Sequence, residues 1–263
     1  MRVQAKGEER RQYDEESGRR RRATSHVVVA MMILSAMMAC GQGGNGTNGG
    51  RVAGDSATAN VAENTPDPAK ERSGVSDRTP RVIILGTSLT AGLGLDPEKA
   101  YPAVMQQLAD SAGVPVRIVN AGLSGETSAG ALRRAAWVLD QPADVVLLEV
   151  GANDGLRGVD PDSTYANLIR LVDSVRTYQP STKVALVQME APTNLGPKYT
   201  LAFHDAYGRA AKDKGVPLLP FLLEGVAGVA TLNQGDGIHP NQEGARRVAA
   251  TMWDGLKPLL PPN

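Results

Sequence analysis

The chain has 263 residues, with 41% hydrophobic but only 4% aromatic side chains, so its core must be built mainly from aliphatic residues. Lysine plus arginine and aspartate plus glutamate each total 28, and this zero net charge gives no general attraction to nucleic acid, which we do not expect as a partner. The single cysteine, Cys40, excludes a disulfide or a Cys-based zinc site within the chain, and the three histidines leave few candidates for chemistry that needs imidazole.

The first 39 residues have the pattern of an export signal. Four arginines at 19–22 precede the apolar run VVVAMMILSAMMA at 27–39, and Cys40 follows it directly. The run is well short of the roughly 20 residues that a membrane-spanning helix needs. Ala39 before Cys40 resembles the lipobox of bacterial lipoproteins, although Met37 stands where that pattern prefers Leu. This resemblance implies lipidation of Cys40, whereas the residues alone also fit a plain signal peptide or a short uncleaved anchor.

The next segment contains almost no large apolar side chain and is rich in Gly, Ser, Thr and Pro. Such a composition cannot bury enough surface to offset the entropy cost of ordering, so we expect a disordered tether. We therefore divide the chain into a signal peptide of the lipoprotein type at 1–39, a tether at 40–80 and one folded domain at 81–263. We expect this protein to be a monomer.

Within the folded domain, short apolar runs alternate with segments of helical periodicity, which predicts βαβ units. We therefore expect an α/β fold, a three-layer α/β/α sandwich with a mostly parallel five-stranded sheet. The predicted strands are Val82–Leu85, Val116–Val119, Asp144–Val150, Lys183–Met189 and Val216–Leu219. The predicted helices are Glu98–Ala112, Ser128–Leu139, Pro161–Tyr178, Pro197–Lys214 and Asn241–Leu256. Ligands bind such sheets at the carboxyl ends of the strands, so the residues that follow each strand are the candidates for chemistry.

Two candidates follow the first two strands. Ser88, in GTSLTAG, fits a helix N-cap as well as it fits a nucleophile. The dinucleotide pattern G-x-G-x-x-G and the nucleophile elbow G-x-S-x-G are both absent at this turn. Gly125, in NAGLSGET, either presents its backbone N–H to a substrate or serves a turn that needs positive φ.

Further candidates follow the later strands. Asn153, in GANDG, either donates to an oxyanion, a role worth about 3–4 kcal/mol in comparable sites, or forms an Asx turn. Asp236 and His239 precede the last helix, and their spacing lets the carboxylate reach imidazole Nδ1 while Nε2 faces a nucleophile. The alternative is a loop histidine beside an Asp that caps the turn. Taken together and in this order, a nucleophile, two donors and an Asp–His pair fill the roles that acyl transfer needs.

The domain resembles the GDSL/SGNH hydrolase family across essentially all of 81–263, in the serine of GTSL, the glycine of NAGLSGET, the asparagine of GAND and the histidine of DGIHPN. ILGTSLTAG, VNAGLSGETS, NDGLRG, VPLLPF and DGIHPN resemble the bacterial thioesterase/lysophospholipase/arylesterase branch. The resemblance implies catalytic roles for three residues, with Ser88 as the nucleophile, His239 as the general base and Asp236 orienting His239. It also implies an oxyanion hole formed by the N–H groups of Ser88 and Gly125 and the side chain of Asn153.

One position departs from the family pattern, because Thr87 stands where the family name implies Asp. A threonine hydroxyl can hydrogen-bond locally but supplies no charge, so the departure leaves open how the loop that carries Ser88 is held. Glu149 ends a buried strand, where hydrogen bonds near the site could hold it as they hold other perturbed carboxylates, but we assign it no role. We also assign no role to His204, which lies in a predicted helix. By resemblance, residues 156–161 are a candidate acyl-chain contact, and a simple connection is the alternative.

We therefore expect a serine hydrolase for carboxylic esters, namely lysophospholipid, aryl or short-acyl esters, with thioesters as a further substrate class. We expect no cofactor, and no metal because the sequence shows no cluster with ligand spacing. A lipid anchor on Cys40 implies membrane attachment in the bacterial cell envelope, outside the cytoplasm. Gly41 in place of the Asp that signals inner-membrane retention in some bacteria favours the outer membrane. Two alternatives remain, a carbohydrate acetylesterase and a non-catalytic surface-binding lipoprotein.

Overall fold

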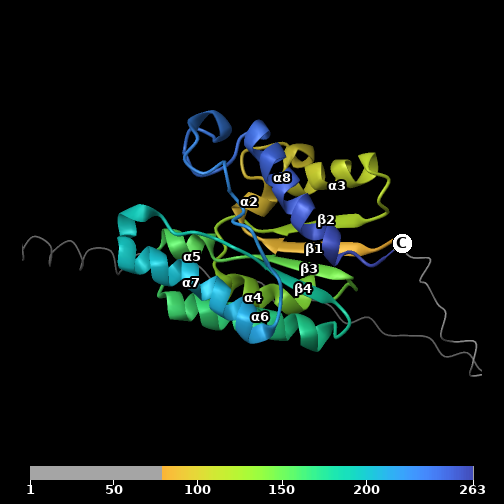
Figure 1. The fold of residues 1–263 in the computed structure, drawn as a ribbon, viewed down its shortest axis with the longest axis horizontal. Coiled ribbons are helices and arrows are strands. Elements are labelled where there is room, and N and C mark those ends of the chain that lie inside the picture. Colours follow the sequence, from red (N-terminus) through yellow and green to blue (C-terminus); the bar gives the residue numbers. More distant parts are fainter. Residues whose placement is uncertain (1–78, 263) are drawn as a thin grey trace, which may run out of the picture. The chain divides into compact units, whose positions relative to one another are not determined.

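The computed structural model describes residues 79–262, which form the domain drawn in Figure 1. The expected signal peptide at 1–39, Cys40 and the tether up to residue 78 lie outside the described residues. Within the part that is described, no helix has both the length and the apolar character needed to cross a membrane.

The centre of the domain is one five-stranded sheet in the order β2-β1-β3-β4-β5, and every neighbouring pair is parallel. The predicted α/β fold is therefore confirmed. Of the three inner strands, β1 and β3 are almost completely buried, which explains why their sequences are continuous apolar runs rather than alternating ones. The strands are β1 (Arg81–Gly86), β2 (Arg117–Gly122), β3 (Val145–Glu149), β4 (Lys183–Val187) and β5 (Leu218–Leu219).

Helices cover both faces of the sheet (Figure 1). The short α2 (Ser88–Ala91) lies with α3 (Tyr101–Ser111) and α8 (Gln242–Leu256) on one face. The other face carries α4 (Ser128–Val138), the short α5 (Ala152–Leu156), α6 (Pro161–Tyr178) and α7 (Pro197–Lys214). Short 3-10 turns are found at Pro97–Lys99, Thr193–Leu195, Ala230–Leu232 and Lys257–Leu259.

The long helices begin and end where local chemistry dictates. In α6, Asp160 accepts a hydrogen bond from the N–H of Asp162, and Pro161 occupies the first helical position, where no N–H is required. The buried positions of α6 recur at helical spacing, so one face of the helix packs on the core. In α7, Gly215 ends the helix in the left-handed conformation that glycine adopts without strain.

Most expected bounds shift by no more than three residues, as in β2 and β4, but two elements differ from the sequence expectation in kind. The helix expected at Glu98–Ala112 is divided, because Ala100 is extended and α3 begins only at Tyr101. Pro102 explains the division, since inside a continuous helix it would lose a hydrogen bond and clash with the preceding turn, whereas the first turn of α3 accommodates it. The strand expected at Val216–Leu219 contributes only two residues to the sheet, and Pro217 has no N–H to donate.

The strand order places the candidate residues at one edge of the sheet. The chain leaves β1 for β2 on one side and then crosses to β3 on the other side of β1. Parallel sheets with this order bind ligands at the switch point, in the crevice outside the carboxyl ends of the strands. Ser88 follows β1, Gly125 follows β2 and Asn153 follows β3, so all three lie at this edge.

Candidate active site

Ser88 is the first residue of α2, directly after β1. Thr87 is extended and caps the helix, because its side chain accepts a hydrogen bond from the N–H of Leu89. Gly92 ends the helix after one turn in the left-handed conformation, with φ of 74°. The capping role that the sequence left open for Ser88 thus belongs to Thr87, and the Ser88 hydroxyl is available for other contacts.

The structure brings the three candidate catalytic residues into one series of hydrogen bonds. Ser88 Oγ lies 2.9 Å from His239 Nε2, and His239 Nδ1 lies 2.6 Å from Asp236 Oδ2. The other carboxylate oxygen of Asp236 accepts the backbone N–H groups of Ile238 and His239 at 2.9 and 3.0 Å. Both oxygens of Asp236 are therefore engaged in holding the imidazole at the nucleophile.

These contacts keep Asp236 ionised. The hydrogen bond from the His239 side chain, followed by those from the His239 and Ile238 backbone, lowers the pKa of Asp236 from 3.8 to about 2. A carboxylate in this position holds the imidazole in the tautomer that leaves Nε2 free to accept a proton. It also stabilises the imidazolium that forms once the proton has been accepted.

The loop that carries Asp236 and His239 does not directly follow β5, as the sequence analysis placed it, because residues 220–235 intervene. A bridge between Asn233 and Pro240 closes the loop. Gln234 adds a second tie, since its N–H donates to His239 O at 2.7 Å and its side chain donates to Leu93 O, just after α2, also at 2.7 Å. The loop is thus fastened beside the turn that carries Ser88.

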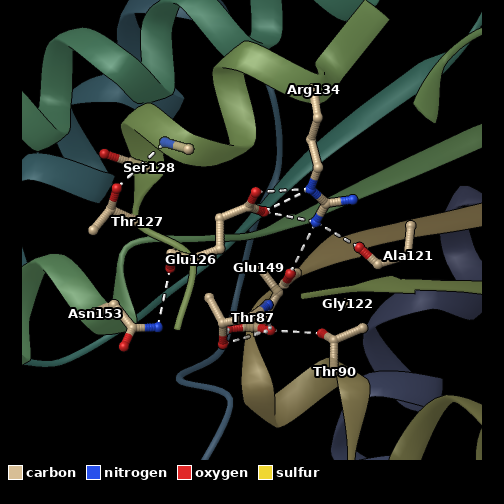
Figure 2. A network of polar contacts seen from close by, with 12 residues as sticks. Thr87, Thr90, Ala121, Gly122, Glu126, Thr127, Ser128, Arg134, Glu149 and Asn153 are labelled. Carbon is tan, nitrogen blue, oxygen red and sulfur yellow. Dashed lines mark hydrogen bonds and ion pairs between the residues drawn. The ribbon is translucent and has the colours of Figure 1, made fainter. Parts of the chain in front are cut away.

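The two further oxyanion candidates lie on neighbouring loops. Gly125 has φ of 76°, and a side chain added there would meet only the Arg157 guanidinium, at 4.0 Å. The space on the side-chain face of this glycine is therefore open. Asn153 lies in the helix α5 rather than in an Asx turn, and its Nδ2 donates to Glu126 O at 3.0 Å (Figure 2). This bond uses one of the two amide hydrogens and leaves the other for a ligand.

Asp154, the residue after Asn153, holds the two donor loops together. It is buried, and its carboxylate accepts the N–H and the hydroxyl of Ser128 at 2.7 and 2.5 Å. Ser128 is the first residue of α4, so this contact joins the start of α4 to α5. The Gly125 loop precedes α4 and Asn153 is part of α5, so their separation depends on Asp154.

Arg134 is a supporting residue that sequence analysis missed. Its guanidinium contacts the Glu126 carboxylate, with Nε 2.8 Å from both oxygens, and also donates to Gly86 O and Ala121 O (Figure 2). One side chain therefore joins the ends of β1 and β2 to the loop that carries Gly125. The sequence did contain an indication of this role. Arg134 lies at helical spacing from the small and apolar residues of α4 that are buried, and this spacing places it on the inward face of the helix.

Glu149 is the second missed residue. It ends β3, is fully buried and accepts hydrogen bonds from Thr87 and Thr90, on either side of the nucleophile (Figure 2). Burial raises its pKa from 4.5 to about 7, and the bonds from Thr90 and Thr87 oppose that rise. The loop that carries Ser88 is thus held by Thr87 through a carboxylate on the neighbouring strand, in a chain that lacks Asp at position 87.

The remaining described side chains near the site show no further catalytic group. His204 lies in α7 and pairs through Nδ1 with Glu190 at 2.7 Å. Among residues 79–262, no group of His, Cys, Asp and Glu side chains could hold a metal ion. A narrow hollow beside Ser88 and His239 is lined largely by leucines, namely Leu89, Leu93, Leu95, Leu222 and Leu223.

A serine bonded to an imidazole whose other nitrogen faces a carboxylate is the arrangement that serine hydrolases use to form acyl-enzymes. Its position at the strand ends of a doubly covered parallel sheet, with a glycine N–H and an asparagine amide nearby, defines the SGNH class. The model of the GDSL-like Lipase/Acylhydrolase family matches residues 84–247, and the chain belongs to this family.

Known proteins of this kind match most of the folded domain. The chain is 40% identical over 181 residues to "Esterase TesA" of Pseudomonas aeruginosa, covering 68% of this chain and 89% of that protein. It is 37% identical over 180 residues to "Thioesterase 1/protease 1/lysophospholipase L1" of Escherichia coli, covering 68% and 84%. The crystal structure of the psychrotrophic esterase EstA from Pseudoalteromonas, inhibited by monoethylphosphonate, superimposes with a TM-score of 0.65 at 34% identity, covering 68% of this chain and 97% of EstA. The protein is accordingly a carboxylic ester hydrolase.

Proposed function

We propose that this enzyme hydrolyses carboxylic esters through an acyl-enzyme on Ser88. The observation that carries the proposal is the series of hydrogen bonds from Ser88 Oγ through His239 to Asp236, at 2.9 and 2.6 Å. His239 removes the hydroxyl proton, Ser88 Oγ bonds to the ester carbonyl carbon, and His239 then protonates the leaving alcohol as the ester bond breaks. Water repeats the sequence on the acyl-enzyme, which releases the acid and restores Ser88.

The developing oxyanion would be stabilised by the N–H groups of Ser88 and Gly125 and by the Asn153 side chain. Ser88 supports this role because the first N–H of a helix has no intrahelical partner. Asn153 supports it because its amide keeps one hydrogen beyond the bond to Glu126 O. Removal of one such donor costs about 100- to 1,000-fold in kcat in comparable sites.

The substrates we propose are esters with an apolar acyl group, namely lysophospholipid, aryl or short-acyl esters, and thioesters as a further class. Two exposed leucines support this choice. Leu123 precedes Gly125 on the same loop, and Leu156 ends the helix that carries Asn153. Arg157 donates to Gly125 O at 3.0 Å and so ties these two loops together.

We also propose that the enzyme is lipid-anchored through Cys40 in the bacterial cell envelope, outside the cytoplasm, with the outer membrane as the favoured location. The support is in the sequence alone, because Cys40 directly follows a short apolar run and four arginines precede that run. A tether of this length and composition would let the domain reach substrates near the membrane surface.

The test of the activity follows p-nitrophenyl esters from acetyl to palmitoyl with the wild type and Ser88→Ala. We expect turnover and one fluorophosphonate adduct in the wild type, and neither in the variant. Absence of both in the wild type would favour the non-catalytic binding protein. Turnover confined to acetyl esters, together with deacetylation of acetylated sugars, would favour the carbohydrate acetylesterase.

The test of the anchor compares the wild type with Cys40→Ser in cells fed a labelled fatty acid. We expect label and membrane association in the wild type only. Equal membrane association of an unlabelled wild type and the variant would contradict lipidation and favour a short uncleaved anchor. Release of both proteins in soluble form would favour a plain signal peptide.

A further inference from the structure

The turn that carries Ser88 rests on one buried carboxylate. Glu149 Oε2 accepts the N–H of Thr87 at 2.9 Å and the hydroxyl of Thr90 at 2.6 Å. Its other oxygen, Oε1, accepts the hydroxyl of Thr87 at 3.0 Å (Figure 2). These bonds reach the residue before Ser88 and the residue two positions after it, so a single side chain from β3 fixes both sides of the nucleophile.

The same contacts decide which backbone groups remain available. The N–H of Thr87 is bonded to Glu149, and the N–H of Leu89 donates to Thr87 Oγ1 at 3.4 Å. The N–H of Ser88 lies between these two engaged groups, at the first position of a helix, where it has no intrahelical partner. The network therefore orients the one donor of this turn that faces a developing oxyanion.

When Glu149 is ionised, its carboxylate only accepts hydrogen bonds, which fixes the direction of every bond in the network. Thr90 Oγ1 gives its hydrogen to Glu149, so in its 2.8 Å contact with Tyr101 the tyrosine hydroxyl is the donor. A chain of donors thus runs from Tyr101 through Thr90 to the carboxylate. A protonated Glu149 would carry a hydrogen of its own, and the hydroxyl of Thr87 or Thr90 would have to turn and accept it, which reverses part of this network.

From this geometry we propose that Glu149, in its ionised form, is a positioning residue for Ser88, and that Thr87 is the neutral donor which lets the carboxylate fill that role. The proposal rests on the proposed role of Ser88 as nucleophile. An aspartate at position 87 would place a second carboxylate at hydrogen-bond distance from Glu149. Two carboxylates that close do not both ionise, so the turn would lose part of this support around neutral pH.

The surroundings of Glu149 agree with a single titration near neutrality. Burial raises its pKa to about 7. Tyr101 from α3 and Tyr207 from α7 face it, and the pKa of each tyrosine is raised, first by burial. Arg134 from α4 is bound to Glu126 instead, and within residues 79–262 no lysine or arginine forms an ion pair with Glu149. Among the described residues, neutral hydroxyls and the backbone N–H groups of Thr87 and Thr90 therefore stabilise the negative charge.

The experiment measures kcat and KM for p-nitrophenyl butyrate across acid to alkaline pH, together with the rate of fluorophosphonate labelling and the thermal midpoint. Glu149→Gln keeps the shape and removes the charge. We expect a fall in kcat on the order of 100-fold, as for a misplaced reacting group, with KM little changed and one ionisation missing from the pH profile. Glu190→Gln is the matched control, since Glu190 follows the next strand and pairs with His204.

Substitutions at position 87 test the partner. Thr87→Ser keeps the donors and should keep the wild-type pH profile. Thr87→Asp should move the acid limb of kcat to higher pH, and adding Glu149→Gln to it should remove that shift. Thr87→Val, which loses one hydroxyl, should lower kcat and leave the expected ionisation in place. This set also covers the case in which Glu149→Gln fails to fold.

Two results would overturn the proposal. One is a Glu149→Gln enzyme with wild-type kcat and pH profile per folded molecule, even with a lower thermal midpoint, because that outcome describes a purely structural residue. The other is a Thr87→Asp profile that superimposes on the wild type. Both results presuppose turnover, so they differ from a failure of the serine-hydrolase proposal, in which wild type and variants would all be inactive.

Discussion

At the scale of single residues, Asp236 shows how an exposed carboxylate can remain fully ionised. Its side chain is 46% exposed, yet both oxygens accept hydrogen bonds from His239 or the adjacent backbone. These bonds lower its pKa to about 2. A depressed carboxyl pKa means that the contribution of Asp236 is present above its ordinary value of 3.8 and is lost only as the pH falls through about 2.

Asp236→Asn tests this assignment. The amide keeps the shape but favours the wrong imidazole tautomer, so we expect kcat to fall on the order of 10⁴-fold, as in a comparable triad. Asp254→Asn, on the surface of α8, is the control and should leave kcat unchanged. Steady-state kinetics with p-nitrophenyl butyrate measure both. A loss of less than tenfold would mean that Asp236 does not set the tautomer of His239.

The residues that approach the substrate were predictable because each follows a strand in chain order, at the edge where parallel sheets bind ligands. The structure places Ser88, Asp236 and His239 in one series of contacts. Helical spacing indicates the inward position of Arg134, but the partners of Arg134 and Glu149 were not predictable. Their partners lie eight and 62 residues away, and such contacts depend on how α4 and β3 pack against β1.

At the scale of secondary-structure elements, predictability followed length and local chemistry. The expected bounds of α6 and α7 match the structure, because a long apolar stripe and a proline at the start mark each helix. The short helices α2 and α5 were not predicted, since four or five residues show no periodicity. Strand order and register follow from packing, which the apolar runs do not reveal.

At the β2 edge of the sheet, a side chain covers backbone groups that have no neighbouring strand to pair with. β2 is the outermost strand next to β1, and the side chain of Gln106 in α3 lies along it. Gln106 Oε1 accepts the N–H of Ile118 at 2.8 Å, and Nε2 donates to Val116 O at 2.8 Å. The amide thus takes the place of the peptide group of a further strand. An unpaired edge of this kind is a template for association with another chain.

Gln106→Ala should therefore promote association. We expect a lower free energy of unfolding, by about 1–2 kcal/mol for the two hydrogen bonds lost at β2 and an exposed one lost to Asp110, and oligomers detectable by size-exclusion chromatography with light scattering. Gln107→Ala is the matched control on the same helix, because that side chain donates to Glu98 O at 3.4 Å and not to β2. A variant with the same measured mass as the wild type at high concentration would show that other features protect the edge.

At the scale of the whole molecule, the buried carboxylate of Glu149 makes the stability of the fold depend on pH, and its ionised form, which we propose supports activity, is the less stable one. Burial raises the pKa of Glu149 from 4.5 to about 7, so the folded state binds this proton more tightly than the unfolded chain does. The stability that this group contributes is complete below pH 4.5 and is lost as the pH rises through about 7. The shift corresponds to about 3 kcal/mol of unfolding free energy.

Glu149→Gln should abolish this pH dependence, because an amide does not titrate. Urea unfolding of both proteins from pH 4.5 to above 7 should show the wild type losing stability relative to the variant across that window. Asp236 does not obscure the comparison, since its contribution is lost only towards pH 2. Parallel curves would mean that Glu149 does not titrate in the fold and that its hydrogen bonds hold one charge state throughout. If the curves diverge while kcat of the variant stays low, the ionised form of Glu149 that best positions Ser88 is also the form that destabilises the fold. That outcome would mean that selection has favoured the geometry of the nucleophile over the last few kcal/mol of stability.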